Sequence, residues 1–292
     1  MNAALDSPSE REVILEEGTI RYRERGSGEP IVFIHGLLVN GLLWRKVVTE
    51  LEDGFRCIAP DWPLGAHGVA MNPQADLSPP GMARLIAHFI ARLELDRPTV
   101  VGNDTGGAFA QLLAANHPER VGRLVLTNAD AFARFLPPAF RYLQWLSRVP
   151  GSSWLLAQGA RVPAVRRLPL AYGSLTKRPM DPAVLAEYSA RLLADPRVRR
   201  DLRKVLRGIS ARYTLAAAER LRAFDRPALL AWASEDRVFP MALAERLLEL
   251  LPRATLEPIA DSYAFVPEDQ PIRLAQLIRD FVSEGQPRLT AA

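Results

Sequence analysis

Short apolar runs of strand length alternate with helical patterns along most of this chain, and this alternation constrains the fold more than any other feature. From Pro30 onward the runs IVFIH, RCIAP, TVVGN and RLVLTN are separated by segments with helical spacing. Such alternation is typical of a parallel sheet whose right-handed crossover helices cover both faces. Before it, REVILEE and TIRYRERG predict two antiparallel strands. The sequence therefore predicts an α/β fold.

The alternation stops between residues 134 and 224. This segment contains no run that resembles a buried strand, whereas several of its stretches have the 3.6-residue spacing of amphipathic helices. After it, PALLAWASED and TLEPI resume the strands. We predict a core domain whose two halves are residues 1–133 and 225–292, with residues 134–224 as a helical cap. Ligands of open α/β sheets bind beyond the carboxyl ends of the strands, so we expect the site between core and cap.

Composition points to a protein that acts on small molecules. The chain has 292 residues, 48% of them apolar, and its net charge of +4 is interspersed with acidic residues rather than clustered. A nucleic-acid surface would need clustered basic and aromatic residues, so the basic stretches 161–167 and 197–207 are interpreted as solvated helix faces. No apolar run is long enough to span a membrane. The first residues, MNAALDSPSEREV, lack the apolar region of a secretion signal. We expect a cytoplasmic monomer or homodimer with no nucleic-acid or membrane partner.

The stretch VVGNDTGGAFAQL, residues 100–112, places Asp104 at the junction of a strand and a helix. Gly102 precedes it by two residues and Gly106 follows it by two. Small residues at these positions let strand and helix approach closely, which strains the backbone of the residue between them and lifts its side chain into the cleft. The helix amino terminus behind it favours a negative charge. The alternative is that Asp104 is an ordinary helix N-cap.

Two other segments place polar groups near this turn. His35 and Gly36 end a strand, so the backbone N–H of Leu37 could join that of Thr105 in holding an oxyanion or a leaving group. In WASEDRVFP, Asp236 follows the next-to-last strand and is well placed to orient a histidine. The alternative for Asp236 is a turn residue or a helix N-cap.

By these residues the chain resembles the α/β-hydrolase superfamily over residues 11–282, and the aspartate at the elbow is similar to the branch that holds haloalkane dehalogenases and epoxide hydrolases. The resemblance implies the α/β-hydrolase fold, a mostly parallel eight-stranded sheet flanked by helices with an inserted helical cap. It also implies that Asp104 opens an alkyl halide or epoxide to form an alkyl-enzyme ester, and that Asp236 orients a histidine whose activated water hydrolyses the ester. It implies no metal and no other cofactor.

The histidine of this pattern is missing. Aligning DSYAFVPEDQP on the last loop of the family puts Ala264 at its position, and a methyl group cannot take a proton from water. Either the chain carries a substitution that traps an intermediate, or its lineage works without this histidine. His67, in a loop at the same edge of the sheet as Asp104, is a candidate surrogate base or substrate contact; the alternative is a loop histidine with structural partners. Tyr263, beside the vacant position, is a further polar candidate.

The substrate-binding positions depart from both enzyme classes. Haloalkane dehalogenases hold the halide with a tryptophan after the nucleophile and an asparagine after His-Gly, where this chain has Thr105 and Leu37. Epoxide hydrolases usually have a proline two residues after His-Gly, where this chain has Leu38. They also use cap tyrosines as donors, and such donors remain available in the predicted cap, namely Tyr142, Tyr172, Tyr188 and Tyr213. We therefore expect an epoxide-hydrolase-like more than a dehalogenase-like enzyme with a small, largely apolar substrate. Asp130, shortly after RLVLTN, is a reserve acid.

Three functions stay open on the sequence alone. The first is a hydrolase with an Asp104 nucleophile and without the usual base. The second is a non-hydrolytic enzyme in which an apolar pocket raises the pKa of Asp104, so that it serves as general acid or base in an elimination, decarboxylation or cyclisation. The third is a ligand-binding pseudoenzyme.

Overall fold

Eight strands form one sheet in the computed structural model, which describes residues 9–159 and 161–284. Their order is β1-β2-β4-β3-β5-β6-β7-β8. β2 pairs antiparallel with both β1 and β4, and the other neighbours are parallel. The expected α/β fold with a mostly parallel eight-stranded sheet is confirmed. The strands are β1 (Ser9–Leu15), β2 (Gly18–Arg25), β3 (Glu29–Ile34), β4 (Phe55–Pro60), β5 (Thr99–Asp104), β6 (Arg123–Ala129), β7 (Ala228–Ala233) and β8 (Ala254–Ile259).

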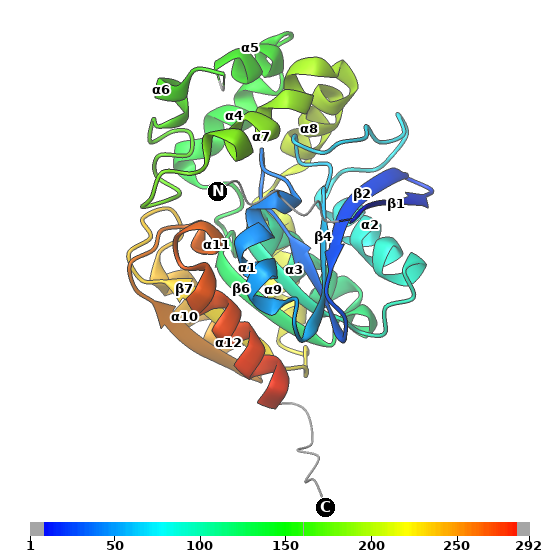
Figure 1. Cartoon of the computed structure of the whole chain (residues 1–292), viewed down its shortest axis with the longest axis vertical. Coiled ribbons are helices and arrows are strands. Elements are labelled where there is room, and N and C mark those ends of the chain that lie inside the picture. The colour runs from blue at the N-terminus through cyan, green and yellow to red at the C-terminus, as the bar shows by residue number, and fades with distance from the viewer. Residues whose placement is uncertain (1–8, 160, 285–292) are drawn as a thin grey trace, which may run out of the picture.

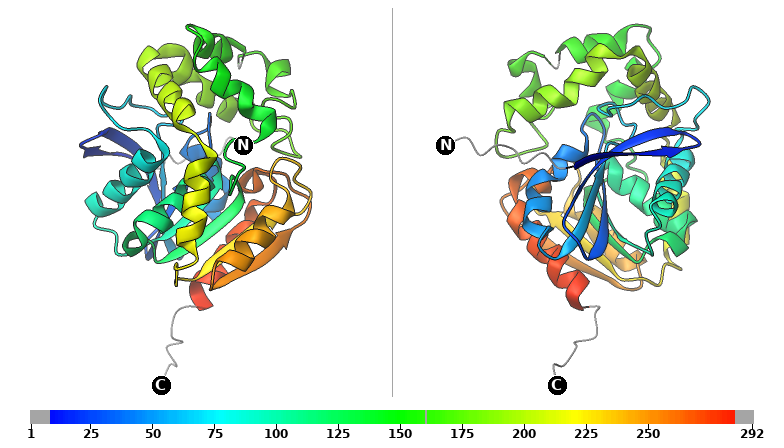
Figure 2. Two further views of the ribbon diagram at one scale, coloured as in Figure 1. Left: turned by 180° about the vertical axis from the view of Figure 1, so that it is seen from behind. Right: turned by 45° about the vertical axis from the view of Figure 1, so that its right-hand side comes forward.

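Helices cover both faces of the sheet. On one face α1 (Arg45–Leu51) contacts α12 (Pro271–Glu284), and in Figure 1 both lie in front of the strands. On the other face α3 (Thr105–Asn116) contacts α2 (Pro79–Arg92) and α9 (Ala211–Leu221), and α10 (Met241–Leu250) lies on the same side, as Figure 2 shows. Burial on both faces explains why the central strands are continuous apolar runs, such as ALLAWA in β7, every residue of which is buried.

The cap lies above the carboxyl ends of the strands (Figure 1). Its helices lie between β6 and β7 in the sequence. Asp181 and Asp195 cap the starts of α7 and α8, and each is followed by a proline, as expected for helix amino termini. α9, the last helix of the segment 134–224, packs against α3 and so lies with the core layer. The cap helices are α4 (Arg141–Leu146), α5 (Ser152–Gly159), α6 (Pro163–Arg166), α7 (Pro182–Ala194) and α8 (Pro196–Gly208).

Short helices complete the architecture. They are η1 (Gly41–Trp44), η2 (Pro118–Arg120), η3 (Pro138–Phe140) and α11 (Val266–Asp269). Across residues 9–159 and 161–284, none of the helices has the length and apolar character needed to cross a membrane. Five segments carry the candidate site residues, namely the loop after β3, the β5–α3 junction and the loops after β6, β7 and β8.

Candidate active site

Asp104 stands at the turn between β5 and α3 in a strained conformation, with φ 55° and ψ −134°. This region of φ is rare for residues other than glycine. The turn requires the neighbouring glycine, because a β-carbon at Gly106 would collide with the backbone carbonyl oxygens of Ile34 and His35. The side chain of Asp104 makes no capping hydrogen bond to α3. The ordinary N-cap alternative therefore does not describe this residue.

The carboxyl group of Asp104 faces a cavity of about 250 Å³ between core and cap. The backbone N–H groups of Thr105 and Leu37 and the Thr105 hydroxyl face it and lower its pKa. Gly36 is required beside them, because a β-carbon there would overlap the Asp104 carboxyl group. Burial is the largest influence and raises the pKa of Asp104 to about 7, with a further increase from the nearby charge of Asp236. Near neutral pH this side chain thus exists in both protonation states.

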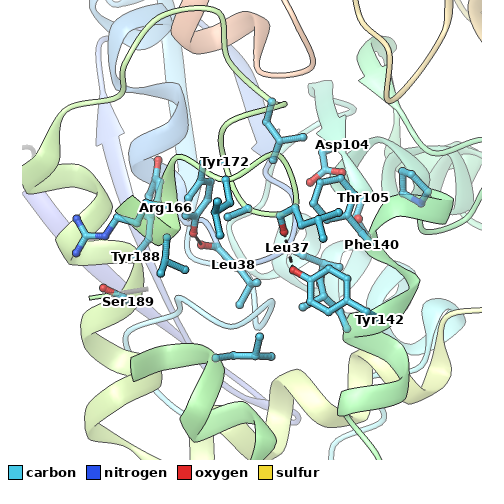
Figure 3. A pocket seen from close by; sticks show the side chains of 18 of the residues that line it. Leu37, Leu38, Asp104, Thr105, Phe140, Tyr142, Arg166, Tyr172, Tyr188 and Ser189 are labelled. Atoms are coloured by element: carbon cyan, nitrogen blue, oxygen red, sulfur yellow. Dashed lines mark hydrogen bonds between the residues drawn. The ribbon is translucent and has the colours of Figure 1, made fainter. Parts of the chain in front are cut away.

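The rest of the cavity wall is largely apolar. Figure 3 shows Asp104 and Thr105 at one end of the cavity and Arg166, Tyr188 and Ser189 at the other. The wall between them comes mainly from cap residues, among them Phe140, Leu143, Leu156, Leu168, Leu170 and Leu192. Such a wall favours a small, largely apolar ligand.

The cap tyrosines differ in whether their hydroxyl groups already have a hydrogen-bond acceptor. The Tyr142 hydroxyl donates to the Leu170 carbonyl at 2.6 Å, and that of Tyr172 donates to the Leu38 carbonyl at 2.8 Å. The Tyr188 hydroxyl is buried and has no partner within the described residues. Tyr213 does not line the cavity. Tyr188 is therefore the cap tyrosine best able to bind a polar atom of a ligand, at the end of the cavity away from Asp104.

Asp236 is buried in the loop after β7 and is fixed by two donors. Its Oδ2 accepts the Asn128 side-chain amide at 2.8 Å, and its Oδ1 accepts the Val238 N–H at 2.7 Å. Asn128 is the penultimate residue of β6, and its own Oδ1 accepts the Ala233 N–H at 2.7 Å, so it joins the ends of β6 and β7. Burial raises the pKa of Asp236 to about 6. Asp236 does not cap α10, whose N-cap residue is Pro240.

Ala264 lies fully buried in the loop after β8, where its carbonyl accepts the Asn103 side-chain amide at 2.7 Å. Two acidic residues that the sequence analysis did not identify, Glu268 and Asp269, also hold this loop in place. Glu268 forms an ion pair with Arg45, and the Asp269 carboxylate accepts the N–H groups of Lys177 at 2.9 Å and Tyr263 at 3.0 Å. In the sequence, only the adjacent acidic residues Glu268 and Asp269 of PEDQP indicate these contacts. Contacts with other parts of the chain thus hold the loop in which the family resemblance led us to expect a histidine.

None of the chain's four histidines lines the cavity. His35 accepts the Trp62 N–H at Nε2, 2.9 Å away, and burial lowers its pKa to about 3, so it is a neutral brace. His67 is buried with its Nε2 3.3 Å from Asp201 Oδ2 on α8. His67 is therefore a loop histidine with structural partners, and its alternative role as a surrogate base has no geometric support.

Asp130 is a second buried acid linked to Asp104. Its Oδ1 accepts the Leu136 N–H at 2.9 Å, and its Oδ2 lies 3.1 Å from Oγ1 of Thr105, the hydroxyl that also lowers the pKa of Asp104. Burial and the charge of Asp104 raise the pKa of Asp130 well above its ordinary value. Asp130 thus reaches the site through Thr105 rather than through a histidine.

A strained residue between a strand and a helix, with backbone donors from the loop after β3 and a helical cap above, defines the nucleophile-elbow class of α/β proteins. The chain belongs to the α/β hydrolase fold family, whose sequence profile matches residues 29–271.

Individual relatives agree with this membership. The chain is 32% identical over 267 residues to haloalkane dehalogenase 2 of Mycobacterium tuberculosis, covering 89% of this chain and 90% of that protein. It is 28% identical over 292 residues to the cis-3-alkyl-4-alkyloxetan-2-one decarboxylase of Xanthomonas campestris, covering 88% and 89%. An α/β hydrolase fold protein from Burkholderia ambifaria has the same fold, with a TM-score of 0.77 over 94% of this chain and 98% of that one, at 22% identity. These relatives do not support our expectation of an epoxide-hydrolase-like over a dehalogenase-like enzyme.

Proposed function

We propose that this chain is an Asp-nucleophile enzyme of the α/β hydrolase fold that acts on a small, largely apolar alkyl electrophile. One observation carries the proposal: Asp104 is held in a strained turn with its carboxyl group against two backbone N–H donors at the end of an apolar cavity. The same donors suit the carbonyl oxygen of an ester formed when the other carboxylate oxygen attacks carbon. The similarity to a haloalkane dehalogenase supports this chemistry.

We favour a strained oxygen ring, an epoxide or a β-lactone, over an alkyl halide as the electrophile. Thr105 and Leu37 replace the tryptophan and asparagine that hold a halide in dehalogenases. Opening of a strained ring is driven by the strain itself and needs no halide site. A β-lactone has a further advantage, because its leaving oxygen becomes a carboxylate and requires no proton donor.

A second candidate is decarboxylation, which closes the cycle without a base. Asp104 attacks the alkyl carbon of a β-lactone and the ring C–O bond breaks to give a carboxylate. The carboxylate then leaves as carbon dioxide, its electron pair forms a C=C bond, and the ester C–O bond breaks to return Asp104. This route is favoured by the absence of all four histidines from the cavity wall and by similarity to an oxetanone decarboxylase.

The direct test is to incubate the protein with terminal epoxides, alkyl bromides and cis-dialkyl β-lactones while recording intact mass and volatile products. A lasting adduct mapped to Asp104 supports a nucleophile that lacks its base. Alkene and carbon dioxide without a lasting adduct support the decarboxylase. Tight binding with neither adduct nor product would overturn the enzyme proposal and leave a ligand-binding pseudoenzyme.

We expect the rate of adduct formation to rise with pH and to level off above a midpoint of about 7. The nucleophile is the ionised carboxylate, and burial raises the pKa of Asp104 to about 7, so the reactive form is depleted below that value. The rate should be measured by intact mass between pH 5 and 9 with a neutral electrophile. A flat profile over this range would contradict an ionisable Asp104 as the attacking group.

Thr105→Val should raise this midpoint by about 1 unit, because the variant loses one donor to the Asp104 carboxylate. A hydroxyl has a single proton, so Thr105 cannot donate to two carboxylates at once, and we infer that Asp130 is protonated and donates to Oγ1 of Thr105. Asp130→Asn, whose amide can donate in the same way, is the matched control and should leave the midpoint nearly unchanged. A midpoint lowered by a unit or more in Asp130→Asn would show that Asp130 is charged.

A further inference from the structure

One half of the cap has an unusual distribution of charge. Residues 131–180 contain eight arginines and lysines and no aspartate or glutamate. The cap's acidic residues begin at Asp181, at the start of α7. α5 and α6, which belong to the basic half, lie along the outer edge of the cap in Figure 1. The basic residues of this half are Arg134, Arg141, Arg148, Arg161, Arg166, Arg167, Lys177 and Arg178.

Exposed apolar side chains concentrate on the same half. Trp145 is 73% exposed and Leu155 is 63% exposed. Large exposed apolar residues are scattered singly on most soluble proteins, whereas a concentration of them marks an interaction site. We use the term cap surface for these residues together with the exposed arginines Arg148, Arg161 and Arg167. The apolar members are Trp145, Val149, Trp154, Leu155, Val162, Leu168 and Leu170.

On α4 and the turn after it, basic and apolar side chains share one face. Arg141, Trp145 and Arg148 follow one another at intervals of four and three residues, so they lie on one face of α4 and the turn after it. Leu143, on the other side of α4, is buried and lines the cavity. In the part of the chain that the structure describes, Arg148 and Arg167 form no ion pair with a carboxylate. Their charges are therefore available to an outside partner.

The cavity opens onto this surface. Leu168 and Leu170 both line the cavity and are more than half exposed, at 52% and 53%. Beside them a second hollow of about 540 Å³ shares Arg166 and Tyr172 with the cavity wall. The basic residues that line this second hollow are Arg166, Arg167, Lys177 and Arg178. Lys177 and Arg178 form ion pairs with Glu235 and Asp261, and Asp181 also lines the hollow, so its unneutralised positive charge comes from the side of Arg167.

We propose that the cap surface docks reversibly on an anionic lipid bilayer and that apolar substrate enters the cavity from the bilayer through the mouth at Leu168 and Leu170. Tryptophan and leucine side chains interleaved with arginine match the boundary between headgroups and acyl chains. Arginines without acidic neighbours are attracted to anionic headgroups. An acidic protein would explain the charge but gives no reason for an apolar cavity to open at the contact. The inference modifies the sequence-based expectation of no membrane partner, and it takes the apolar occupant of the cavity from the proposed function.

The test is cosedimentation of the purified full chain with vesicles of phosphatidylcholine alone or with 30% phosphatidylglycerol, in roughly 50 mM and 300 mM salt. We expect binding to the anionic vesicles that weakens at the higher salt. The double variant Arg148→Glu, Arg167→Glu should weaken binding to the anionic vesicles by more than about 25-fold. Each positive charge removed costs about fivefold in affinity, and each added glutamate is repelled in addition. Trp154→Ser with Leu155→Ser should weaken binding by about tenfold or more. Cosedimentation is measured without substrate, so its outcome is independent of the test of the proposed chemistry. Vesicle binding can fail while adduct formation succeeds, and adduct formation can fail while vesicle binding succeeds.

Matched controls lie on the core. Arg92→Glu changes an exposed arginine at the end of α2, and Ile272→Ser changes an apolar residue of α12 that is 68% exposed. Both should bind vesicles as the parent protein does, and thermal unfolding checks that all variants are folded. Absence of binding to anionic vesicles, or equal losses in cap and core variants, would overturn the proposal. Sedimentation velocity provides a further check. A dimer that forms through the cap surface and does not bind vesicles would also overturn the proposal.

Discussion

Asp104→Asn is expected to form no adduct with any electrophile that modifies the parent protein, which corresponds to a loss of at least about 10⁴-fold in the rate of alkylation. The amide has nearly the shape of the carboxyl group, and its oxygen can still accept from the N–H groups of Leu37 and Thr105. It is not a nucleophile, so only the chemistry is removed. Intact mass over time is the measurement, and an adduct that persists elsewhere on the chain would show that Asp104 is not the reacting group.

The same substitution should stabilise the fold at high pH, which makes loss of activity by unfolding an unsuitable explanation. The pKa of Asp104 is raised from 3.8 to about 7, so the folded state binds more protons than the unfolded state between these values. Stability from this group is complete below pH 3.8 and is lost as pH rises through 7. We expect Asp104→Asn to raise the free energy of unfolding on the order of 2 kcal/mol at pH 9 and little at pH 4. Asp96→Asn, whose side chain is 89% exposed, should show no such dependence.

The sequence could predict the sheet because each strand carries its own signal. Apolar runs such as IVFIH and RLVLTN are buried on both faces in β3 and β6, and local alternation is enough to detect them. The elbow was also visible, because the glycines around Asp104 are needed by contacts within a few residues and with one neighbouring strand. Local composition and spacing encode these features.

The parts of the site that depend on distant pairs could not be predicted. Asn128 meets Asp236 across 108 positions of the chain, and Asn103 meets the Ala264 carbonyl across 161. Neither pair leaves a periodic pattern. The link between Thr105 and Asp130 joins the ends of β5 and β6, and only their parallel pairing brings these side chains together. His67 was misleading for the same reason, because its partner Asp201 belongs to a cap helix whose position the sequence does not specify.

If Asp104 forms an ester as proposed, we expect the side chain at position 264 to decide whether that ester can be hydrolysed. Asn103, the residue before Asp104, donates to the Ala264 carbonyl, so the end of β5 is joined to the loop after β8. The charge of Asp236 raises the pKa of Asp104, so the two carboxyl groups interact electrostatically. An imidazolium near both carboxylates would oppose that effect. Under the proposed function, position 264 is therefore where an added imidazole is expected to interact with both Asp104 and Asp236.

Ala264→His is accordingly expected to convert a lasting adduct into turnover, with hydrolysis of the Asp104 ester accelerated by about 10²–10⁴-fold. Because Ala264 is fully buried, added bulk costs about 1–3 kcal/mol of stability, and Ala264→Phe serves as the control that adds bulk without a proton acceptor. Hydrolysis is followed by the decay of adduct mass and by incorporation of ¹⁸O from labelled water. Adding Asp236→Asn should remove most of the gain, because the imidazole would lose the acid that orients it. A folded Ala264→His variant whose adduct decays no faster than that of Ala264→Phe would show that the cavity has diverged from hydrolytic use, which would strengthen the decarboxylase alternative.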